Sequence, residues 1–453
     1  MFGYFEYVGS SGGSVRALFF VVVMSAVAPQ QSTGQAPAGE LQERVRSSFD
    51  RSQEYALYLP PGYTPEREWP ILFVLDPRGR AVLALQLFRE GAARLGWVVM
   101  SSYNSRSDSL AELNDAAMEA MLRSAQDGIS IDRSRLYIAG FSGTARAALW
   151  FAVTLRGHVA GVIAAGGALG FELGGPEAIF AGDSTFAYFG GAGMHDFNYE
   201  EVVAMAGRFG TMKIPYRLAA FPGPHNWPPA DICGEAMEWL ELRAMRAGRR
   251  PTDTAWVRTR QEADLARAAA LERAGRLDEA LQQYEAITRD YLPSPATSRA
   301  VERAAALRNN SAVKRHRAEA RKLAEKDLAQ ARDLQKVLAG ARSSSRSPEP
   351  DDLLKKLKIA KLKEQSKRGD SLQAASAERL LNRTFVFLAY YEPRSYLAQK
   401  SADRALAMLE AATAIAPLQG ESCTMLHAAL RATGAKHPAP LNVKCPPPAG
   451  QAR

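Results

Sequence analysis

The chain has 453 residues, several times the length of a small domain, so we expect more than one hydrophobic core. Hydrophobic residues make up 47% and charged residues 23%, which is ordinary for a globular protein and excludes a largely disordered chain. The net charge of +9 concentrates after residue 240, but no nucleic-acid motif accompanies it, so we expect solvated Arg and Lys side chains on long helices rather than a nucleic-acid partner.

The N-terminus has the pattern of an export signal. Arg16 precedes an apolar run at residues 17–28, which is followed by a polar stretch rich in small residues. This run is too short to span a bilayer, which takes about 20 apolar residues. We therefore expect a signal peptide and linker over residues 1–36, no stable membrane span, and a periplasmic or secreted protein. The alternative is a buried strand or a frayed terminus.

Residues 40–250 alternate between strand-like and helix-like segments. The strand-like segments are 55–59, 69–75, 97–103, 136–139, 159–165, 186–189 and 216–221. The helix-like segments are 81–95, 110–126, 145–155, 199–209 and 230–247. Segment 69–75 is almost continuously apolar, which is typical of a strand buried on both faces. This alternation predicts a doubly wound α/β domain with a mostly parallel sheet.

The composition changes after residue 250 to Ala, Leu, Glu, Arg and Lys with helical periodicity. We expect an all-helical domain over residues 251–435 and a Pro-rich tail over residues 436–453. Two windows, around Gly275 and Ala405, have small and aromatic residues at the offsets of a tetratricopeptide repeat. They lie far apart, whereas a stable stack needs about three adjacent repeats. A tetratricopeptide-like domain and a plain helical bundle are therefore equal alternatives.

The chain has three cysteines, Cys233, Cys423 and Cys445. In an exported protein an odd number allows one disulfide and one free thiol. A bridge between Cys423 and Cys445 would tie down the Pro-rich tail, although the sequence leaves the pairing open. Cys233 lies in a helix-like segment and is expected to be a small buried hydrophobe.

The sharpest motif is GFSGT at residues 140–144, directly between a predicted strand and a predicted helix. A tight strand–turn–helix connection lifts its central Ser side chain out of the backbone, as a nucleophile requires. The residues two positions on either side must be small, because the strand and the helix pass close together there. Gly140 meets this requirement, and Thr144 departs from the usual Gly or Ala. Ser142 is the predicted nucleophile.

A nucleophilic Ser needs a base, and the base needs an acid to orient it. His225 follows the last predicted strand in a loop rich in Pro and Gly, where packing has no need of an imidazole. Asp196 follows the preceding strand. Open α/β sheets place their sites at the carboxyl ends of strands, where all three residues fall. We therefore predict a catalytic triad of Ser142, His225 and Asp196.

Other assignments of these residue types are open. Taken singly, the three residues are also compatible with a surface Ser, a helix-capping Asp and a loop His. His195 is a rival base, although it precedes the acid in the chain. If Asp196 is not the acid, Asp183 or Glu200 is next in line. The order and the strand-end positions of the triad favour the functional interpretation.

Residues 55–240 resemble the α/β-hydrolase superfamily, and within it small esterases related to polyhydroxybutyrate depolymerases, feruloyl esterases and dienelactone hydrolases. The segments that carry the resemblance are YALYLPPGY, VLDPRGR, GFSGTAR and FPGPHNWPP. It implies ester hydrolysis through an acyl-enzyme, with no metal or organic cofactor. It also implies an oxyanion hole made by the amide of Gly143 and an amide of the loop after the third strand. Relatives often have His-Gly where this chain has Asp76-Pro77. Since Pro77 has no amide hydrogen, Arg78 is the predicted second donor.

We therefore expect an exported serine carboxylic-ester hydrolase that takes a small or polymeric ester. The short interval between the strands near residues 165 and 186 leaves no room for a cap domain, so the site should be open or covered by the C-terminal helices. The helical domain is a candidate surface for a protein partner, and residues 37–250 are expected to hydrolyse small esters alone. The alternatives are an inactive scaffold of the same fold and a peptidase.

Overall fold

The computed structural model describes residues 38–107, 111–169, 186–369, 371–434 and 445. The predicted signal peptide lies outside these residues, as does the predicted tail apart from Cys445. The chain divides into two compact units. The first consists of Met1–Ala192, Glu201–Ala219 and Trp227–Thr254, and the second of Gly193–Glu200, Ala220–Asn226 and Ala255–Arg453. The second unit thus contains the C-terminal helices and two short loops, the 193–200 loop and the 220–226 loop. The domain limits expected from composition stay predictions.

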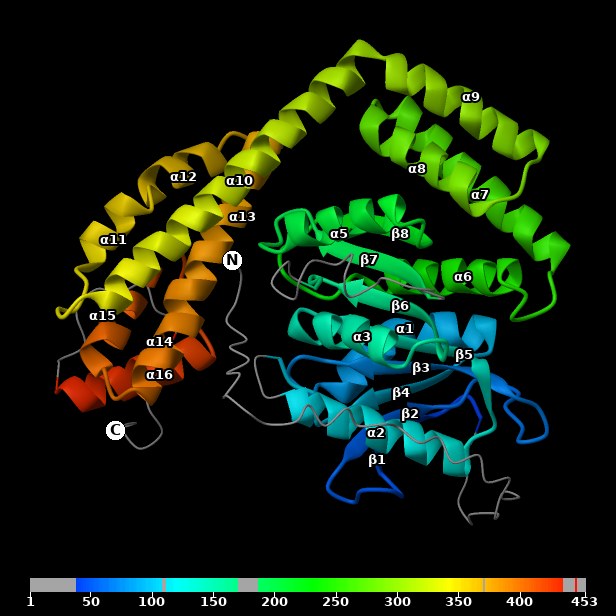
Figure 1. Cartoon of the computed structure of the whole chain (residues 1–453), viewed down its shortest axis with the longest axis horizontal. Coiled ribbons are helices and arrows are strands. Elements are labelled where there is room, and N and C mark those ends of the chain that lie inside the picture. Colours follow the sequence, from blue (N-terminus) through cyan, green and yellow to red (C-terminus); the bar gives the residue numbers. More distant parts are fainter. Residues whose placement is uncertain (1–37, 108–110, 170–185, 370, 435–444, 446–453) are drawn as a thin grey trace, which may run out of the picture. The chain divides into compact units, whose positions relative to one another are not determined.

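An eight-stranded sheet forms the centre of the first unit (Figure 1). In spatial order its strands are β1 (Leu41–Arg46), β2 (Glu54–Tyr58), β4 (Val98–Ser102), β3 (Trp69–Leu75), β5 (Ile131–Phe141), β6 (Val159–Ala165), β7 (Ala187–Gly193) and β8 (Tyr216–Phe221). β3 pairs in parallel with β4 and β5, and β6 pairs in parallel with β5 and β7. The pairs β1–β2 and β2–β4 are antiparallel. The predicted α/β fold with a mostly parallel sheet, followed by a helical region, is confirmed.

Helices cover both faces of this sheet. They are α1 (Ala81–Leu95), α2 (Ala111–Gly128), α3 (Gly143–Thr154), α5 (Tyr199–Thr211) and α6 (Ala230–Arg246). Every residue of β3 is buried, and successive side chains point to opposite faces. Ile71, Phe73 and Leu75 join a core cluster with residues of α2, α3 and α5. Leu72 and Val74 join another with residues of α1 and α6. One apolar strand therefore supports both cores, as its sequence predicts.

The second unit continues as a run of helices. They are α7 (Thr254–Arg273), α8 (Leu277–Asp290), α9 (Pro295–Asn309), α10 (Ser311–Ser343), α11 (Pro350–Lys356), α12 (Ile359–Ser366), α13 (Leu372–Val386), the π-helical turn η2 (Phe387–Tyr391), α14 (Glu392–Ala398), α15 (Ala402–Thr413) and α16 (Glu421–Thr433). Ser371 is the N-cap of α13, and its side chain accepts a hydrogen bond from the amide of Ala374 (3.1 Å). A tetratricopeptide-like arrangement stays a prediction.

Cys423 of α16 and Cys445 form a disulfide, with their Cα atoms 5.3 Å apart. This is the pairing that the spacing near the C-terminus suggested. Cys233 is a buried free thiol on α6, and burial raises its pKa, so it behaves as the small hydrophobe expected from the sequence. Among the described residues, no helix is both long and apolar enough to cross a membrane.

Candidate active site

Ser142 is the single residue between the end of β5 and the start of α3, as the sequence predicts. Its backbone has φ 56° and ψ −125°, in the left-handed region that residues with a side chain rarely adopt. Such a conformation costs about 1–3 kcal/mol and persists only where the surroundings enforce it. The Ser142 amide donates to the carbonyl of Ala165 at the end of β6 (2.8 Å), and the amide of Ala145 donates to the Ser142 carbonyl (3.0 Å).

Glycines allow the backbone to pass this closely. A Cβ on Gly140 would lie 2.1 Å from the carbonyl oxygen of Thr144, and one on Gly167 would lie 2.4 Å from that of Ser142. A Cβ on Gly143 would lie 2.0 Å from Ser107 Oγ. The contacts at Gly140 and Gly167 are with backbone atoms and leave no room for a methyl group, so both positions require glycine, whereas a methyl group on Gly143 would require the Ser107 side chain to move.

Thr144, which departs from the small residue usual at its position, has a structural role of its own. Its side chain is buried, and its hydroxyl accepts a hydrogen bond from the amide of Phe141 (3.1 Å). The hydroxyl also lies 2.6 Å from the carbonyl oxygen of Leu75, the last residue of β3, to which it donates. The larger residue therefore ties the turn to the neighbouring strand.

Asp196 and His225 meet in the second unit. Nδ1 of His225 lies 2.8 Å from Oδ1 of Asp196, whose carboxylate is fully buried, and the His225 side chain is 20% exposed. The same Oδ1 accepts a hydrogen bond from the amide of Asn198 (2.7 Å). A carboxylate on Nδ1 fixes the tautomer that carries its proton there and leaves Nε2 as the proton acceptor. The structure therefore brings together the side chains of the two residues predicted as acid and base.

The 193–200 and 220–226 loops are also joined through their backbones. The amide of Met194 donates to the carbonyl of Phe221 (2.8 Å), and the amide of His195 donates to that of Gly223 (3.0 Å). The ring of Phe197 packs against the imidazole of His225, with 4.2 Å between ring centroids. The imidazole is thus held by a carboxylate and by an aromatic ring, both from the 193–200 loop.

The rival assignments have other partners. Nδ1 of His195 lies 3.1 Å from Oε2 of Glu378 on α13. Glu200 pairs with Arg379 of α13 (2.9 Å), and burial raises the pKa of the Glu200 carboxyl against the effect of this guanidinium. Asp183 lies outside the described residues. His195 thus also has a carboxylate at Nδ1, but the side chains of this pair are 42% and 39% exposed, whereas the Asp196 carboxylate is fully buried. Glu200 pairs with a guanidinium rather than with an imidazole.

The loop after β3 is organised by Asp76, whose carboxylate is fully buried. Burial raises the pKa of this carboxyl, but hydrogen bonds from Arg80, Trp227 and the Arg78 amide outweigh it and hold the pKa below its usual value. The Arg78 amide donates to Asp76 Oδ1 (2.9 Å), and Trp227 Nε1 donates to Oδ2 (2.9 Å). The amide predicted as the second oxyanion donor is therefore directed at this carboxylate. This role of Asp76 was not predicted from the sequence, although the Asp76-Pro77 pair, where relatives often have His-Gly, marks the position.

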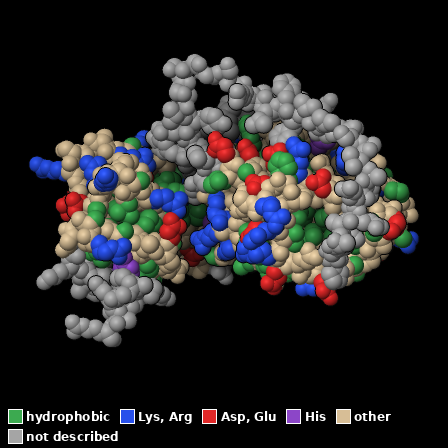
Figure 2. Space-filling view, turned by 90° about the horizontal axis from the view of Figure 1, so that it is seen from below, with side chains coloured by type: hydrophobic (Ala, Val, Ile, Leu, Met, Phe, Trp, Pro, Cys, Tyr) green, Lys and Arg blue, Asp and Glu red, His purple; other side chains and the backbone are tan. Residues whose placement is uncertain are grey.

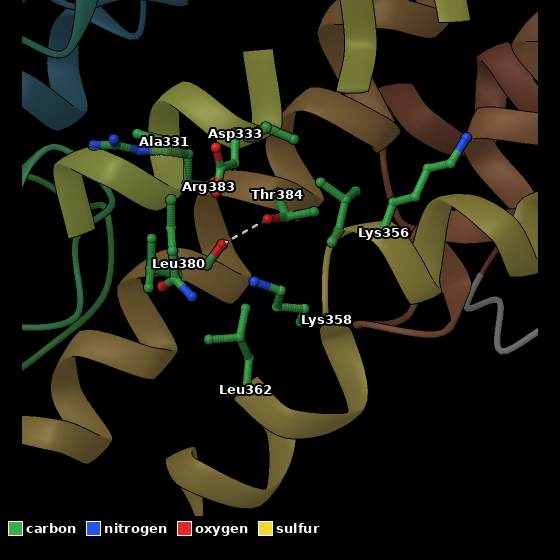
Figure 3. A pocket seen from close by; sticks show the side chains of 11 residues that line it. Ala331, Asp333, Lys356, Lys358, Leu362, Leu380, Arg383 and Thr384 are labelled. Carbon is green, nitrogen blue, oxygen red and sulfur yellow. Dashed lines mark hydrogen bonds between the residues drawn. The ribbon is translucent and has the colours of Figure 1, made fainter. Parts of the chain in front are cut away.

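A small pocket lies in the second unit beside α13 (Figure 3). Figure 3 shows Leu380, Arg383 and Thr384 of α13 lining it together with Leu362 of α12. Its volume of about 30 Å³ has room for about two water molecules. None of the predicted site residues lines this pocket, so it is not the candidate active site.

The described residues contain no group of three or more His, Cys, Asp or Glu side chains that could hold a metal ion. On the face shown in Figure 2, Lys and Arg side chains lie in small groups among Asp and Glu side chains. The positive charge on that face is therefore dispersed rather than gathered in one broad patch.

No protein-family model matches the sequence, and no curated protein matches it. Several solved structures are similar to less than half of the chain. S-formylglutathione hydrolase (FrmB) from Staphylococcus aureus is 15% identical, with 46% of this chain and 99% of that chain covered and a TM-score of 0.36. A ferulic acid esterase is 16% identical, with 45% and 98% covered and a TM-score of 0.35. Dipeptidyl peptidase 4 from Porphyromonas gingivalis is 14% identical, with 45% and 35% covered and a TM-score of 0.34.

Proposed function

We propose that this chain is a serine hydrolase that cleaves carboxylic esters, with Ser142 as nucleophile, His225 as base and Asp196 as the orienting acid. The observation that carries the proposal is the hydrogen bond between the buried Asp196 carboxylate and Nδ1 of His225. Such a bond places the imidazole proton on Nδ1 and makes Nε2 the atom that accepts a proton from a hydroxyl. The left-handed turn at Ser142 supports the nucleophile, because strained backbone conformations cluster at catalytic residues.

The strands that precede Ser142, Asp196 and His225 support their assignment to one site. Ser142 follows β5, Asp196 follows β7 and His225 follows β8, and these strands belong to one half of the sheet, in the order β5-β6-β7-β8. Open α/β sheets bind their ligands at the carboxyl ends of the strands. The order Ser, Asp, His along the chain is that of the α/β hydrolases.

In the proposed reaction Ser142 Oγ attacks the ester carbonyl while Nε2 of His225 takes the hydroxyl proton. The tetrahedral intermediate collapses to an acyl-enzyme, and His225 gives its proton to the departing alcohol. Water then attacks the acyl-enzyme with His225 again as base, which releases the acid and restores Ser142. Asp196 stabilises the imidazolium formed in both steps and does not take up a proton itself. The proposed reaction uses no metal or organic cofactor.

The oxyanion of the intermediate needs at least two hydrogen-bond donors. We assign the first to the amide of Gly143, directly after the nucleophile. The Arg78 amide, predicted as the second donor, could bind the oxyanion only after its hydrogen bond to Asp76 Oδ1 is broken. The competing second donor is the hydroxyl of Ser107, which packs against Gly143.

We further propose that the protein is exported. The Cys423–Cys445 disulfide supports this location, because disulfides persist in oxidising compartments. The apolar run at residues 17–28 supplies the signal. Sequencing the N-terminus of the mature protein from its native host tests this: a start between residues 29 and 37 supports export, and a retained Met1 contradicts it.

A scaffold without activity and a peptidase are the alternatives. The departure at Thr144, which favoured a scaffold, is compatible with an intact turn because its hydroxyl bonds to Phe141 and Leu75. Matched ester and anilide substrates with the same acyl group separate esterase from peptidase. We expect the full chain to hydrolyse the ester, and Ser142→Ala to abolish this hydrolysis. Ser134→Ala, an exposed serine of the same strand β5, is the control that retains it. Preferred cleavage of the anilide, or hydrolysis unchanged in Ser142→Ala, contradicts the proposal.

A further inference from the structure

The 193–200 loop, which carries Asp196, is held by side chains of one helix, α13. Three of them donate hydrogen bonds to main-chain carbonyls on either side of Asp196. The bonds run from Arg379 Nη1 to Met194 (3.2 Å), from Asn382 Nδ2 to His195 (3.0 Å), and from Arg383 Nη2 to Phe197. The carbonyl of Asp196 itself accepts from the amide of Tyr199 (3.0 Å). The carbonyls of all four consecutive residues, 194–197, are therefore satisfied.

The spacing of the donors matches the helix. Residues three and four positions apart lie on the same face of an α-helix, as Arg379, Asn382 and Arg383 do. Glu378, one turn before Asn382, contacts the imidazole of His195 from the same helix. The donors on one face of α13 therefore follow the same order as the carbonyl acceptors along the 193–200 loop. A rotation or shift of the helix would break several of these hydrogen bonds at once.

Arg379 anchors this face. Its guanidinium pairs with Glu200 at the end of the loop (2.9 Å) and with Asp327 of α10 (3.1 Å), and it lies over the ring of Tyr199 at 5.0 Å. Its side chain is only 11% exposed. Asp327 also accepts a hydrogen bond from Ser376 of α13. Buried charges with several partners have few alternative positions, so both ends of the loop are fixed relative to α13.

The same contacts reach the base. Arg383 holds the carbonyl of Phe197, and the ring of Phe197 packs against the imidazole of His225. Displacing this residue would change the position of the ring that supports the imidazole. It would also displace Asp196, the preceding residue in the chain, and with it the bond to Nδ1 of His225.

We propose that Arg379, Asn382 and Arg383 of α13 are positioning residues for the catalytic acid and base, Asp196 and His225, which lie in the same unit as this helix. This inference rests on the proposed function. It differs from the expectation that residues 37–250 suffice, because a chain ending at residue 250 lacks all three donors to the 193–200 loop. A misplacement of a catalytic group by about 1 Å can cost about 100-fold in rate.

The test uses the full chain with two variants, Asn382→Ala and Arg383→Ala, and a small activated ester such as nitrophenyl acetate. Neither residue is assigned a contact with the ester, so we expect kcat to fall by about tenfold or more while KM changes less than about threefold. Arg383→Lys, which keeps a donor, should recover part of the loss. Asn382→Ala removes a single neutral hydrogen bond and decides the question if Arg383→Ala fails to fold.

The matched control is Arg342→Ala. Arg342 pairs with the buried Glu392 in the helical region, at a position remote in sequence from the 193–200 loop. The Arg342→Ala protein should have a lower free energy of unfolding, but the fraction that is folded should have the kcat of the unaltered protein. A kcat loss below tenfold in folded Asn382→Ala and Arg383→Ala overturns the positioning role. If the unaltered chain does not hydrolyse the ester and reacts with no serine-directed probe, the proposed function fails first.

Discussion

Asp196 binds His225 through one carboxylate oxygen, while its other oxygen, Oδ2, accepts no hydrogen bond from the described residues. Asp196→Asn keeps the shape of the side chain but favours the wrong tautomer of the imidazole. We expect turnover to fall by about 10⁴-fold with the fold retained. Steady-state kinetics with a circular dichroism control measure this. A loss below about tenfold would assign the acid to another carboxylate, such as Asp183.

The second donor to the oxyanion is either the Arg78 amide or the Ser107 hydroxyl, and a substitution of Ser107 distinguishes them. The Arg78 amide already donates to Asp76, whereas the Ser107 hydroxyl packs beside Gly143. We therefore expect Ser107→Ala to lower kcat by about 10²–10³-fold, the usual cost of one oxyanion donor. Ser105→Ala is the control, because its buried hydroxyl donates to the carbonyl of Asp76 rather than facing Gly143. A kcat within about threefold of the unaltered protein for Ser107→Ala would return the role to Arg78.

The sequence predicted the positions of Ser142, Asp196 and His225 at strand ends, since local patterns mark where strands stop. It did not predict what holds them. The carboxylate of Asp76 accepts a hydrogen bond from Trp227, which lies far along the chain, and the 193–200 loop accepts one from Arg379 of α13. Neither partner has a local motif, because the contacts depend on how distant segments pack.

At the scale of elements, the apolar strands were predicted well and the charged ones were not. β1 reads LQERVR, with exposed and half-exposed residues, because it lies at the edge of the sheet. Its charges hide the alternation that marks a strand. β5 begins at Ile131, earlier than predicted, because its first part contains Asp132, Arg133 and Arg135. The antiparallel pairing of β2 also has no signature in a single strand.

The turn between β5 and α3 gives a stability prediction. Thr144→Val keeps the shape of the side chain but leaves the carbonyl of Leu75 and the amide of Phe141 without the hydroxyl. We expect the free energy of unfolding to fall by about 1–3 kcal/mol. Thr211→Val, at an exposed helix end, is the control and should change it by less than about 0.5 kcal/mol. Equal effects of the two substitutions in urea unfolding would show that the Thr144 hydroxyl does not stabilise the turn.

At the scale of the whole molecule, the two loops that carry Asp196 and His225 cluster with the C-terminal helices rather than with the sheet. A protein of residues 37–250 should therefore retain the sheet and its cores but hydrolyse nitrophenyl acetate about tenfold or more slowly than the full chain. Kinetics on both proteins, with near-ultraviolet circular dichroism to check the folded core, provide the comparison. Equal turnover would show that the sheet positions the loops without α13.

The most direct test of the central claim is covalent labelling of the full-length protein with a fluorophosphonate, followed by peptide mass spectrometry. Only a serine activated by a base reacts rapidly with such a probe. We predict one label, on Ser142, absent in Ser142→Ala and much slower in His225→Ala, while Ser134→Ala labels normally. Failure of Ser142 to react in the folded full-length protein, or a label on another serine that persists in Ser142→Ala, would contradict the assignment of this chain as a serine hydrolase acting through Ser142.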